Sequence, residues 1–185
     1  MGAMSYQGQL LVATPVIGDA NFDRTVVLLL EHGDDGALGL VLNRPTEVAV
    51  LDPLPEWDGL AARPPVVFVG GPVEQGAAIG VAQANVADAT EGWSPVVDGI
   101  GTLDLSRHPS DMSAEIERVR IFAGYAGWGP GQLEGELSVD AWLPFDARPE
   151  DVLGDEPDTL WSRVLRRQGG DLALLSYCPP DPSSN

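Results

Sequence analysis

The sequence predicts a single α+β domain, built on a bent and bulged mixed or antiparallel sheet with a few short helices. Three observations lead to this prediction. The chain has 185 residues, 44% of them hydrophobic, which suffices to bury the core of one domain. Its 22 glycines and 16 prolines are scattered between short apolar runs, so that turns follow one another closely. Most of these runs are adjacent or linked as hairpins, and helical patterns are interspersed late in the chain.

We assign this domain to residues 5–178. Residues 1–4 have the pattern of a cloning remnant, because Met4 follows Met1 and two small residues. Residues 179–185 are expected to form a tail.

Seven short apolar runs predict strands, because they are rich in Val, Ile and Leu and are bounded by turn residues. They are residues 8–13, 25–31, 37–42, 66–69, 77–82, 119–125 and 172–177. The second and third runs are separated by His32-Gly-Asp-Asp-Gly36, whose length and composition are typical of the loop in an antiparallel hairpin.

Two stretches predict helices. The first begins after Pro109, where Ser110 or Asp111 can cap it and apolar residues recur on one face at Met112, Ile116 and Val119. In the second, Asp158 is the cap and Gly169-Gly170 ends the helix. Its apolar stripe and its opposite basic face are formed by Leu160, Trp161, Val164 and Leu165, and by Arg163, Arg166 and Arg167.

Two other segments carry weaker signals. Residues 51–65 contain four prolines and Trp57, which indicates an ordered loop or a short irregular helix. Residues 140–158 are rich in acids, which is typical of a solvated face.

The charge balance disfavours direct nucleic-acid binding. The chain has 28 acidic residues and 10 arginines, no lysine, and a formal net charge of -18, so it repels phosphate backbones. A DNA-binding role would need a concentrated arginine patch. The candidates for such a patch are Arg118, Arg120, Arg163, Arg166 and Arg167.

The same composition predicts a cytoplasmic protein that does not enter a membrane. Cys178 is the single cysteine, so no intramolecular disulfide can form, and no apolar run reaches the length of about 18 residues that a membrane span needs. We interpret Cys178 as a small apolar residue, since a reactive thiolate needs cationic neighbours.

A glycine-rich stretch, Gly124-Tyr-Ala-Gly-Trp-Gly-Pro-Gly-Gln-Leu-Glu134, follows a predicted strand and precedes a possible helix near Pro130. This context suits a phosphate-binding turn. However, Pro130 removes a backbone donor, no lysine is present, and Glu134 and Glu136 add negative charge. The stretch therefore predicts a tight turn that packs Tyr125 and Trp128, on which a partner-binding surface could also be built.

Carboxylates and an imidazole gather near the first hairpin, where they could hold a metal ion or act as acid and base. They are Asp19, Asp23, Glu31, His32, Asp34 and Asp35, with Arg24 among them. Adjacent strand residues point to opposite faces, so Glu31 and His32 cannot both bind one ion on a continuous strand. Common nucleophile motifs are absent as well. We therefore predict no catalytic residue, no metal and no cofactor.

Several blocks in order over residues 8–170 resemble the YqgE/AlgH family of bacterial proteins. They are Gly8-Gln-Leu-Leu-Val-Ala-Thr-Pro15, Asp19 with Phe22-Asp-Arg-Thr-Val-Val27, Glu31-His32, Gly36-Ala-Leu-Gly-Leu-Val-Leu-Asn-Arg-Pro45, Gly70-Gly-Pro-Val73, the glycine-rich stretch and Ala141-Trp-Leu143. The resemblance implies a compact cytosolic α+β protein with a bulged, bent sheet. It implies no agreed mechanism or cofactor, although AlgH is named as a candidate transcriptional regulator. Residues 51–65 and those after Tyr177 depart from the family pattern.

Our first hypothesis is a regulatory or interaction protein that binds another protein or a small ligand through one groove. The groove residues are Arg24, Glu31, His32, Asn43, Arg44, Gly70, Gly71, Tyr125, Trp128, Gln132 and Glu134. The structural alternatives are an Arg24–Glu31 ion pair and a strand end at Asn43-Arg44-Pro45. The alternative functions are an enzyme that uses Glu31, His32 or Asp23 as acid–base groups, and a transcriptional regulator that acts indirectly. The sequence does not identify the partner or the oligomeric state.

Overall fold

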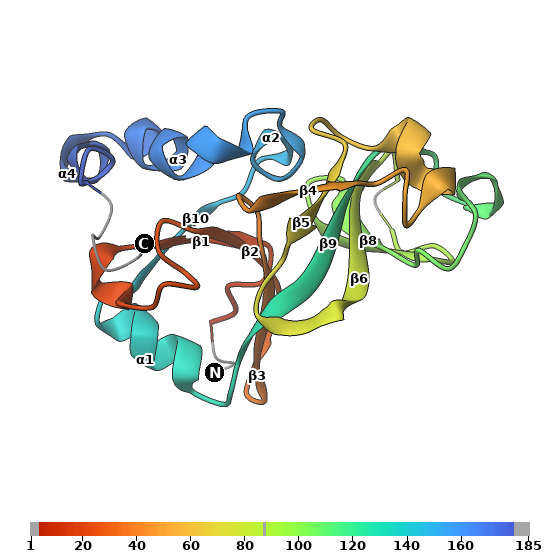
Figure 1. The fold of residues 1–185 in the computed structure, drawn as a ribbon. Coiled ribbons are helices and arrows are strands. Elements are labelled where there is room, and N and C mark those ends of the chain that lie inside the picture. The colour runs from red at the N-terminus through yellow and green to blue at the C-terminus, as the bar shows by residue number, and fades with distance from the viewer. Residues whose placement is uncertain (1–3, 87, 180–185) are drawn as a thin grey trace.

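The computed structural model describes residues 4–86 and 88–179, which form one α+β domain around a curled, half-barrel sheet (Figure 1). Ten strands within these residues pair in the order β10-β1-β2-β3-β9-β6-β8-β7, and β4 and β5 pair beside this path. The β5–β9 pair is parallel and the other pairs are antiparallel. The predicted bent mixed sheet is thus confirmed.

The strands are β1 (Gln9–Ala13), β2 (Val26–Gly33), β3 (Gly36–Val41), β4 (Pro45–Ala49), β5 (Val66–Val69), β6 (Val73–Ala84), β7 (Trp93–Val97), β8 (Ile100–Leu103), β9 (Ile116–Trp128) and β10 (Trp142–Asp146). The α-helices are α1 (Gln132–Ser138), α2 (Pro149–Leu153), α3 (Leu160–Gln168) and α4 (Gly170–Leu175). Short 3-10 helices occupy Pro15–Ile17, Pro55–Leu60, Pro109–Asp111 and Pro157–Thr159.

Apolar residues are buried on both faces of the β1–β2–β3 part of the sheet. Because side chains alternate along a strand, Leu10 and Leu28 face a core cluster that includes α2 and α3, and Leu11 and Val27 face a second cluster that includes α1. Figure 1 shows α2, α3 and α4 along one side of this part of the sheet and α1 along the other. Burial on both faces explains why these strands read as continuous apolar runs.

Strand β9 connects the two halves of the sheet. It pairs with β6 over most of its length, with β5 at Phe122 and Ala123, and with β3 at its C-terminal end. Gly124 lies between these pairings with φ 74°, a conformation that glycine adopts without steric cost. The change of partners therefore coincides with a bend in β9.

The backbones of β5 and β9 approach very closely at this bend. A Cβ added at Gly70 would lie 2.3 Å from the carbonyl oxygen of Gly124, and one added at Gly71 would lie 2.1 Å from the main chain of Tyr125. Neither position has room for a side chain. The Gly70-Gly71 pair is thus required by the packing of the backbone.

Six of the seven predicted strand segments lie in strands, and the last is wrong. Residues 172–177, predicted as a strand, lie mainly in α4. A short apolar run fits both periods, and the left-handed Gly169 and Gly170 start a new helix there instead of an extended strand. The predicted loop 32–36 is also shorter in the structure, because only Asp34 and Asp35 form the turn.

The helix predicted after Pro109 is wrong beyond its first turn. The 3-10 helix Pro109–Asp111 ends at once, and Ile116 and Val119 belong to β9, where they pair with β6. By contrast, α3 is confirmed with its apolar stripe buried and Gly169 at its C-terminus, although Thr159 takes the N-cap position instead of Asp158. The segment 51–65 contains the predicted irregular helix.

The acidic segment 140–158 is not wholly a solvated face. The side chain of Asp151 is only 2% exposed and binds Arg167 through both carboxylate oxygens at 2.7 Å. It also accepts the main-chain N–H of Arg148 at 2.9 Å, at the start of α2. This ion pair links α2 to α3.

We expect Gly71→Ala to lower the free energy of unfolding by about 2 kcal/mol or more, because overpacking against rigid backbone cannot be relieved by a rotamer change. Gly76→Ala is the matched control in the same region, since nothing lies within 4 Å of an added Cβ there. Urea unfolding of both variants measures the difference. Equal midpoints for the two variants would contradict the backbone contact.

Candidate functional site

Six of the eleven predicted site residues line two separate pockets at opposite ends of the β2–β3 hairpin. The hairpin pocket has a volume of about 430 Å³ and is lined by Gln7, Glu31, His32, Gly33, Asp34, Asp35, Gly36, Ala37, Leu38 and Trp128. The arginine pocket has a volume of about 170 Å³ and is lined by Arg24, Asn43, Arg44, Asp158, Trp161 and Ser162. At ~3.3 Å per residue, the length of β2 puts the two about 20 Å apart. The residues predicted for a single groove are thus divided between these two pockets and positions outside them.

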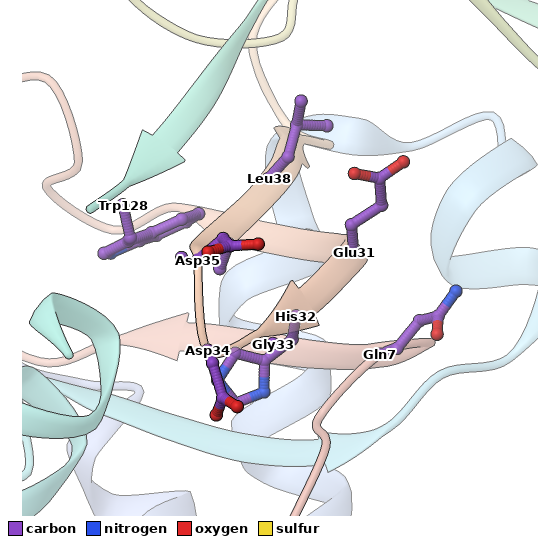
Figure 2. Close-up of a pocket in the computed structure, with 10 residues that line it drawn as sticks. Gln7, Glu31, His32, Gly33, Asp34, Asp35, Leu38 and Trp128 are labelled. Atoms are coloured by element: carbon purple, nitrogen blue, oxygen red, sulfur yellow. The ribbon is translucent and has the colours of Figure 1, made fainter. Parts of the chain in front are cut away.

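The hairpin pocket is built around the two-residue turn Asp34-Asp35. Figure 2 shows Glu31 and His32 pointing to opposite sides of β2, as the alternation of a strand requires. The side chains of Glu31, Asp34 and Asp35 have no hydrogen-bond or ion-pair partner among the described residues, and all three residues are exposed. Three solvated carboxylates therefore surround this pocket.

His32 is held in place through both ring nitrogens. Its side chain is 3% exposed, its Nδ1 accepts the main-chain N–H of Tyr6 at 3.0 Å, and its Nε2 lies 2.6 Å from Oε1 of Glu134. Because Nδ1 is an acceptor, the proton of the neutral ring is on Nε2 and is donated to Glu134. The imidazole thus connects the N-terminal segment, the hairpin and α1.

Glu134 is the carboxylate that accepts this hydrogen bond. The hydrogen bond from His32 and a backbone N–H lower the pKa of Glu134 below its ordinary value. The side chain remains 49% exposed, so solvent weakens the electrostatic part of this interaction.

Glu136, which is not among the predicted site residues, binds Trp128, which lines the hairpin pocket. Oε2 of Glu136 accepts the indole N–H of Trp128 at 2.8 Å and that of Trp142 at 2.9 Å. The two indoles pack edge to face with ring centroids 5.9 Å apart, and Phe22 contacts both. From the sequence, Glu136 is expected only to disfavour an anion, because its contacts with the two indoles depend on elements that the fold brings together.

Three predicted site residues have structural roles in the arginine pocket or beside it. Asn43 is buried, and its amide accepts the N–H of Val26 at 3.1 Å and donates to the carbonyl of Arg24 at 2.8 Å. Arg24 does not pair with Glu31, which lies at the far end of β2; its guanidinium donates to the carbonyl of Cys178 and lies over the ring of Trp161. The carbonyl of Asp23 accepts a hydrogen bond from Arg44.

The remaining predicted residues line neither pocket. Gly70 and Gly71 form the β5–β9 contact, and Tyr125 packs against the core. Gln132 accepts the N–H of Gly129 at 3.0 Å and donates to Glu136 at 3.3 Å, which steadies the first turn of α1.

Residues 4–86 and 88–179 contain no group of three or more His, Cys, Asp or Glu side chains that could hold a metal ion. No helix in the same ranges is long and apolar enough to cross a membrane.

Comparisons with known proteins place this geometry in context. The model of the family described as AlgH-like matches residues 10–173. The chain is 51% identical to a UPF0301 protein of Streptomyces coelicolor, covering 98% of this chain and 96% of that protein. It is 45% identical to a UPF0301 protein of Mycobacteroides abscessus, covering 96% of this chain and 87% of that protein.

Two solved structures have the same fold. The crystal structure of a protein from Corynebacterium diphtheriae is 29% identical, with a TM-score of 0.88, over 96% of this chain and 95% of that chain. The solution structure of the AlgH protein from Pseudomonas aeruginosa is 28% identical, with a TM-score of 0.68, over 97% of this chain and 98% of that chain.

We expect Glu136→Ala to lower the free energy of unfolding by about 2–4 kcal/mol, because two indole N–H groups lose their acceptor. Glu136→Gln keeps a neutral acceptor and should cost about 1 kcal/mol. Chemical denaturation measures both values. If the two variants unfold at the same midpoint as the parent protein, the carboxylate does not organise the cluster.

We expect the pKa of Glu134 to rise toward its ordinary value in His32→Ala, because the main cause of its lowered pKa is removed. A lowered folded-state pKa stabilises the fold above the unfolded-state pKa, and this contribution is lost as the pH falls through the folded-state pKa. Carboxyl ¹³C NMR titration measures the shift. His108→Ala is the control, since His108 contacts Ser110 in a different loop. An unchanged Glu134 titration in His32→Ala would rule out the imidazole as its cause.

Proposed function

This chain belongs to the AlgH-like family, and we propose that it is a non-catalytic regulatory or interaction protein that binds a positively charged segment of a partner protein in the hairpin pocket. The observation that carries the proposal is the contrast within this pocket. Glu31, Asp34 and Asp35 are solvated and without partners among the described residues, while the aromatic and imidazole groups behind them are held firmly.

The charge distribution supports a cationic partner. Lys and Arg side chains are attracted to the three carboxylates, and the net charge of -18 steers a basic segment toward the protein from a distance. The pocket volume of about 430 Å³ is within the range of sites that accept one or two side chains. The exposed turn leaves this end of the hairpin open to a chain passing over it.

The fixed base of the pocket supports binding with little reorganisation. Trp128 is 6% exposed and is held by Glu136 and by its contacts with Phe22 and Trp142. A rigid aromatic surface loses little conformational entropy when a partner binds. The aromatic ring also offers a contact for the methylene stem of a lysine or arginine.

The acid–base alternative receives less support from the same geometry. Both ring nitrogens of His32 already have partners, so a substrate proton would have to displace one of them. Asp23, the third candidate, lies toward the other end of β2, where its carbonyl is bound by Arg44. The three groups are therefore not assembled around one substrate.

A role in transcription is best explained through a protein partner. The arginines that could have contacted DNA are engaged with other groups of the chain, among them Gln83, Glu150, Asp151, Val152, Glu156 and Tyr177. With a net charge of -18, direct DNA binding remains disfavoured. A cytoplasmic location is part of this proposal. A chain with one cysteine forms no internal disulfide, and such a chain suits the reducing environment of the cytoplasm.

The direct test uses a fluorescent tetralysine peptide as the probe at physiological salt. We expect the triple variant Glu31→Gln, Asp34→Asn and Asp35→Asn to bind it at least about tenfold more weakly than the parent protein, because each lost charge contact contributes roughly 0.5–1 kcal/mol. Fluorescence anisotropy measures the dissociation constants.

The matched control neutralises three exposed acids elsewhere, Glu47→Gln, Asp52→Asn and Glu56→Gln. It removes the same net charge and should change the affinity by less than about twofold. Equal losses in the two triple variants would mean that only the overall charge attracts the peptide, and the proposed pocket would be rejected.

A further inference from the structure

The N-terminal segment, residues 5–7, is tied to strand β2 through His32. Apart from local turn bonds within residues 5–9, the hydrogen bonds that hold this segment go to His32 in the part of the chain that the structure describes. The main-chain N–H of Tyr6 donates to the ring Nδ1 at 3.0 Å, and the hydroxyl of Ser5 donates to the His32 carbonyl at 3.4 Å. The Tyr6 ring also packs against the core, with its centroid 5.7 Å from that of the imidazole.

The two ring nitrogens of His32 respond differently to protonation. Nε2 carries a hydrogen in the neutral ring and in the cation, so its contact with Glu134 at 2.6 Å is available to both forms. Nδ1 accepts the Tyr6 N–H only while it is unprotonated, because both nitrogens of the cation are donors. The imidazole is 3% exposed, so solvent has little access to supply the Tyr6 N–H with another acceptor.

The titratable groups near the ring come from three elements. Tyr6 belongs to the N-terminal segment and Glu134 to α1, and the same pocket is lined from the hairpin by Glu31, Asp34 and Asp35. Apart from Tyr6 these groups are carboxylates, and Glu134 touches Nε2 directly, so the positive charge of an imidazolium has a partner. Histidine is also the side chain whose charge ordinarily changes between pH 5 and 8.

We propose that protonation of His32 at Nδ1 releases residues 5–7 from β2 and thereby changes the hairpin pocket. Gln7 lines this pocket together with His32, so movement of the segment alters the lining (Figure 2). Docking of the segment requires an unprotonated Nδ1. It is therefore strongest above the pH at which the ring gains its proton, and it weakens as the pH falls through that value.

Protonation also changes the charge of the pocket. The imidazole lines the pocket beside the solvated carboxylates, and a positive charge there reduces their attraction for Lys and Arg side chains. Acidification is thus expected to weaken binding of a cationic partner. This effect on a partner rests on the function proposed for the pocket, whereas release of the segment does not.

The first experiment follows the ¹⁵N-labelled full chain by NMR between pH 8 and pH 5, the range in which histidines ordinarily titrate. Ring ¹⁵N shifts report protonation of His32, and hydrogen exchange, corrected for its intrinsic pH dependence, reports protection of main-chain N–H groups. We expect the protection of Tyr6 to fall by about tenfold or more as His32 gains its proton. Gly8 is the matched control, because its N–H binds the carbonyl of Leu29 at 2.8 Å and should stay protected.

Two variants separate the charge of the ring from its shape. His32→Asn places a side-chain oxygen that does not titrate near the position of Nδ1, so the protection of Tyr6 should no longer depend on pH. Glu134→Gln keeps an acceptor for Nε2 but removes the negative charge, so the His32 and Tyr6 transitions should move together to lower pH. A purely structural histidine would not make the Tyr6 transition follow that of the ring.

Three results would overturn the proposal. The first is protonation of His32 without loss of Tyr6 protection, and the second is a ring that stays neutral down to pH 5. The third is parallel loss of Gly8 protection, which would mean that the N-terminal end unfolds generally. Transitions that Glu134→Gln leaves in place would count against the role of Glu134 in the switch.

The second experiment measures binding of the fluorescent tetralysine peptide one pH unit above and one below the midpoint found for His32. We expect the parent protein to bind about twofold to fivefold more weakly below the midpoint, and His32→Asn to bind equally at both pH values. Equal binding by the parent protein would overturn regulation of the pocket. If the Tyr6 transition occurs and the peptide binds at neither pH, the function proposed for the pocket fails while the proton-linked release stands.

Discussion

The close contact between the backbones of β5 and β9 is the constraint on which the rest of the structure depends. Because Gly70, Gly71 and Gly124 leave no room for side chains, β9 can bend there and exchange its partners β5 and β6 for β3. That exchange curls the sheet and carries the end of β9 to the β2–β3 turn. Trp128 reaches the hairpin pocket only because of this path.

The short helix α1 follows β9, and its side chains hold together one end of the molecule. Within seven residues it supplies Glu134 to His32 and Glu136 to the two tryptophans, so two carboxylates satisfy one imidazole and two indoles. Buried polar groups of this kind cost free energy unless each has a partner. The glycine-rich stretch is therefore a turn that positions α1, and the pocket beside it is a consequence of that turn.

The β2–β3 hairpin separates two pockets with different linings. Solvated carboxylates gather where the hairpin turns, and two guanidiniums gather where its strands enter the core. In a chain with a net charge of -18, the acidic end follows the general character of the surface, whereas Arg24 at the other end is held by Asn43 and Trp161. A partly buried cation requires such contacts, because its burial is costly without them.

Apolar runs and turn residues were enough to predict the central strands, the first hairpin and α3, because these elements depend on local periodicity and on burial. The edge strands β7 and β10 were missed, since they contain Pro95 and Pro144, which only an edge tolerates. The segment 116–119 had a helical pattern, yet the long pairing with β6 outweighed it. Pairing partners are distant in sequence and leave no local signal.

The fold class, the family motifs, the acidic character and the opposite directions of Glu31 and His32 could be predicted, because all of them follow from composition and local geometry. The folded chain was needed to show that the predicted groove residues are divided between two pockets and other positions, that Gly70 and Gly71 allow a close backbone contact, and that Glu136 accepts hydrogen bonds from two indoles. Those outcomes depend on which segments meet across the bend of β9. A contact between residues far apart in the chain is set by packing, and packing is absent from any single stretch of sequence.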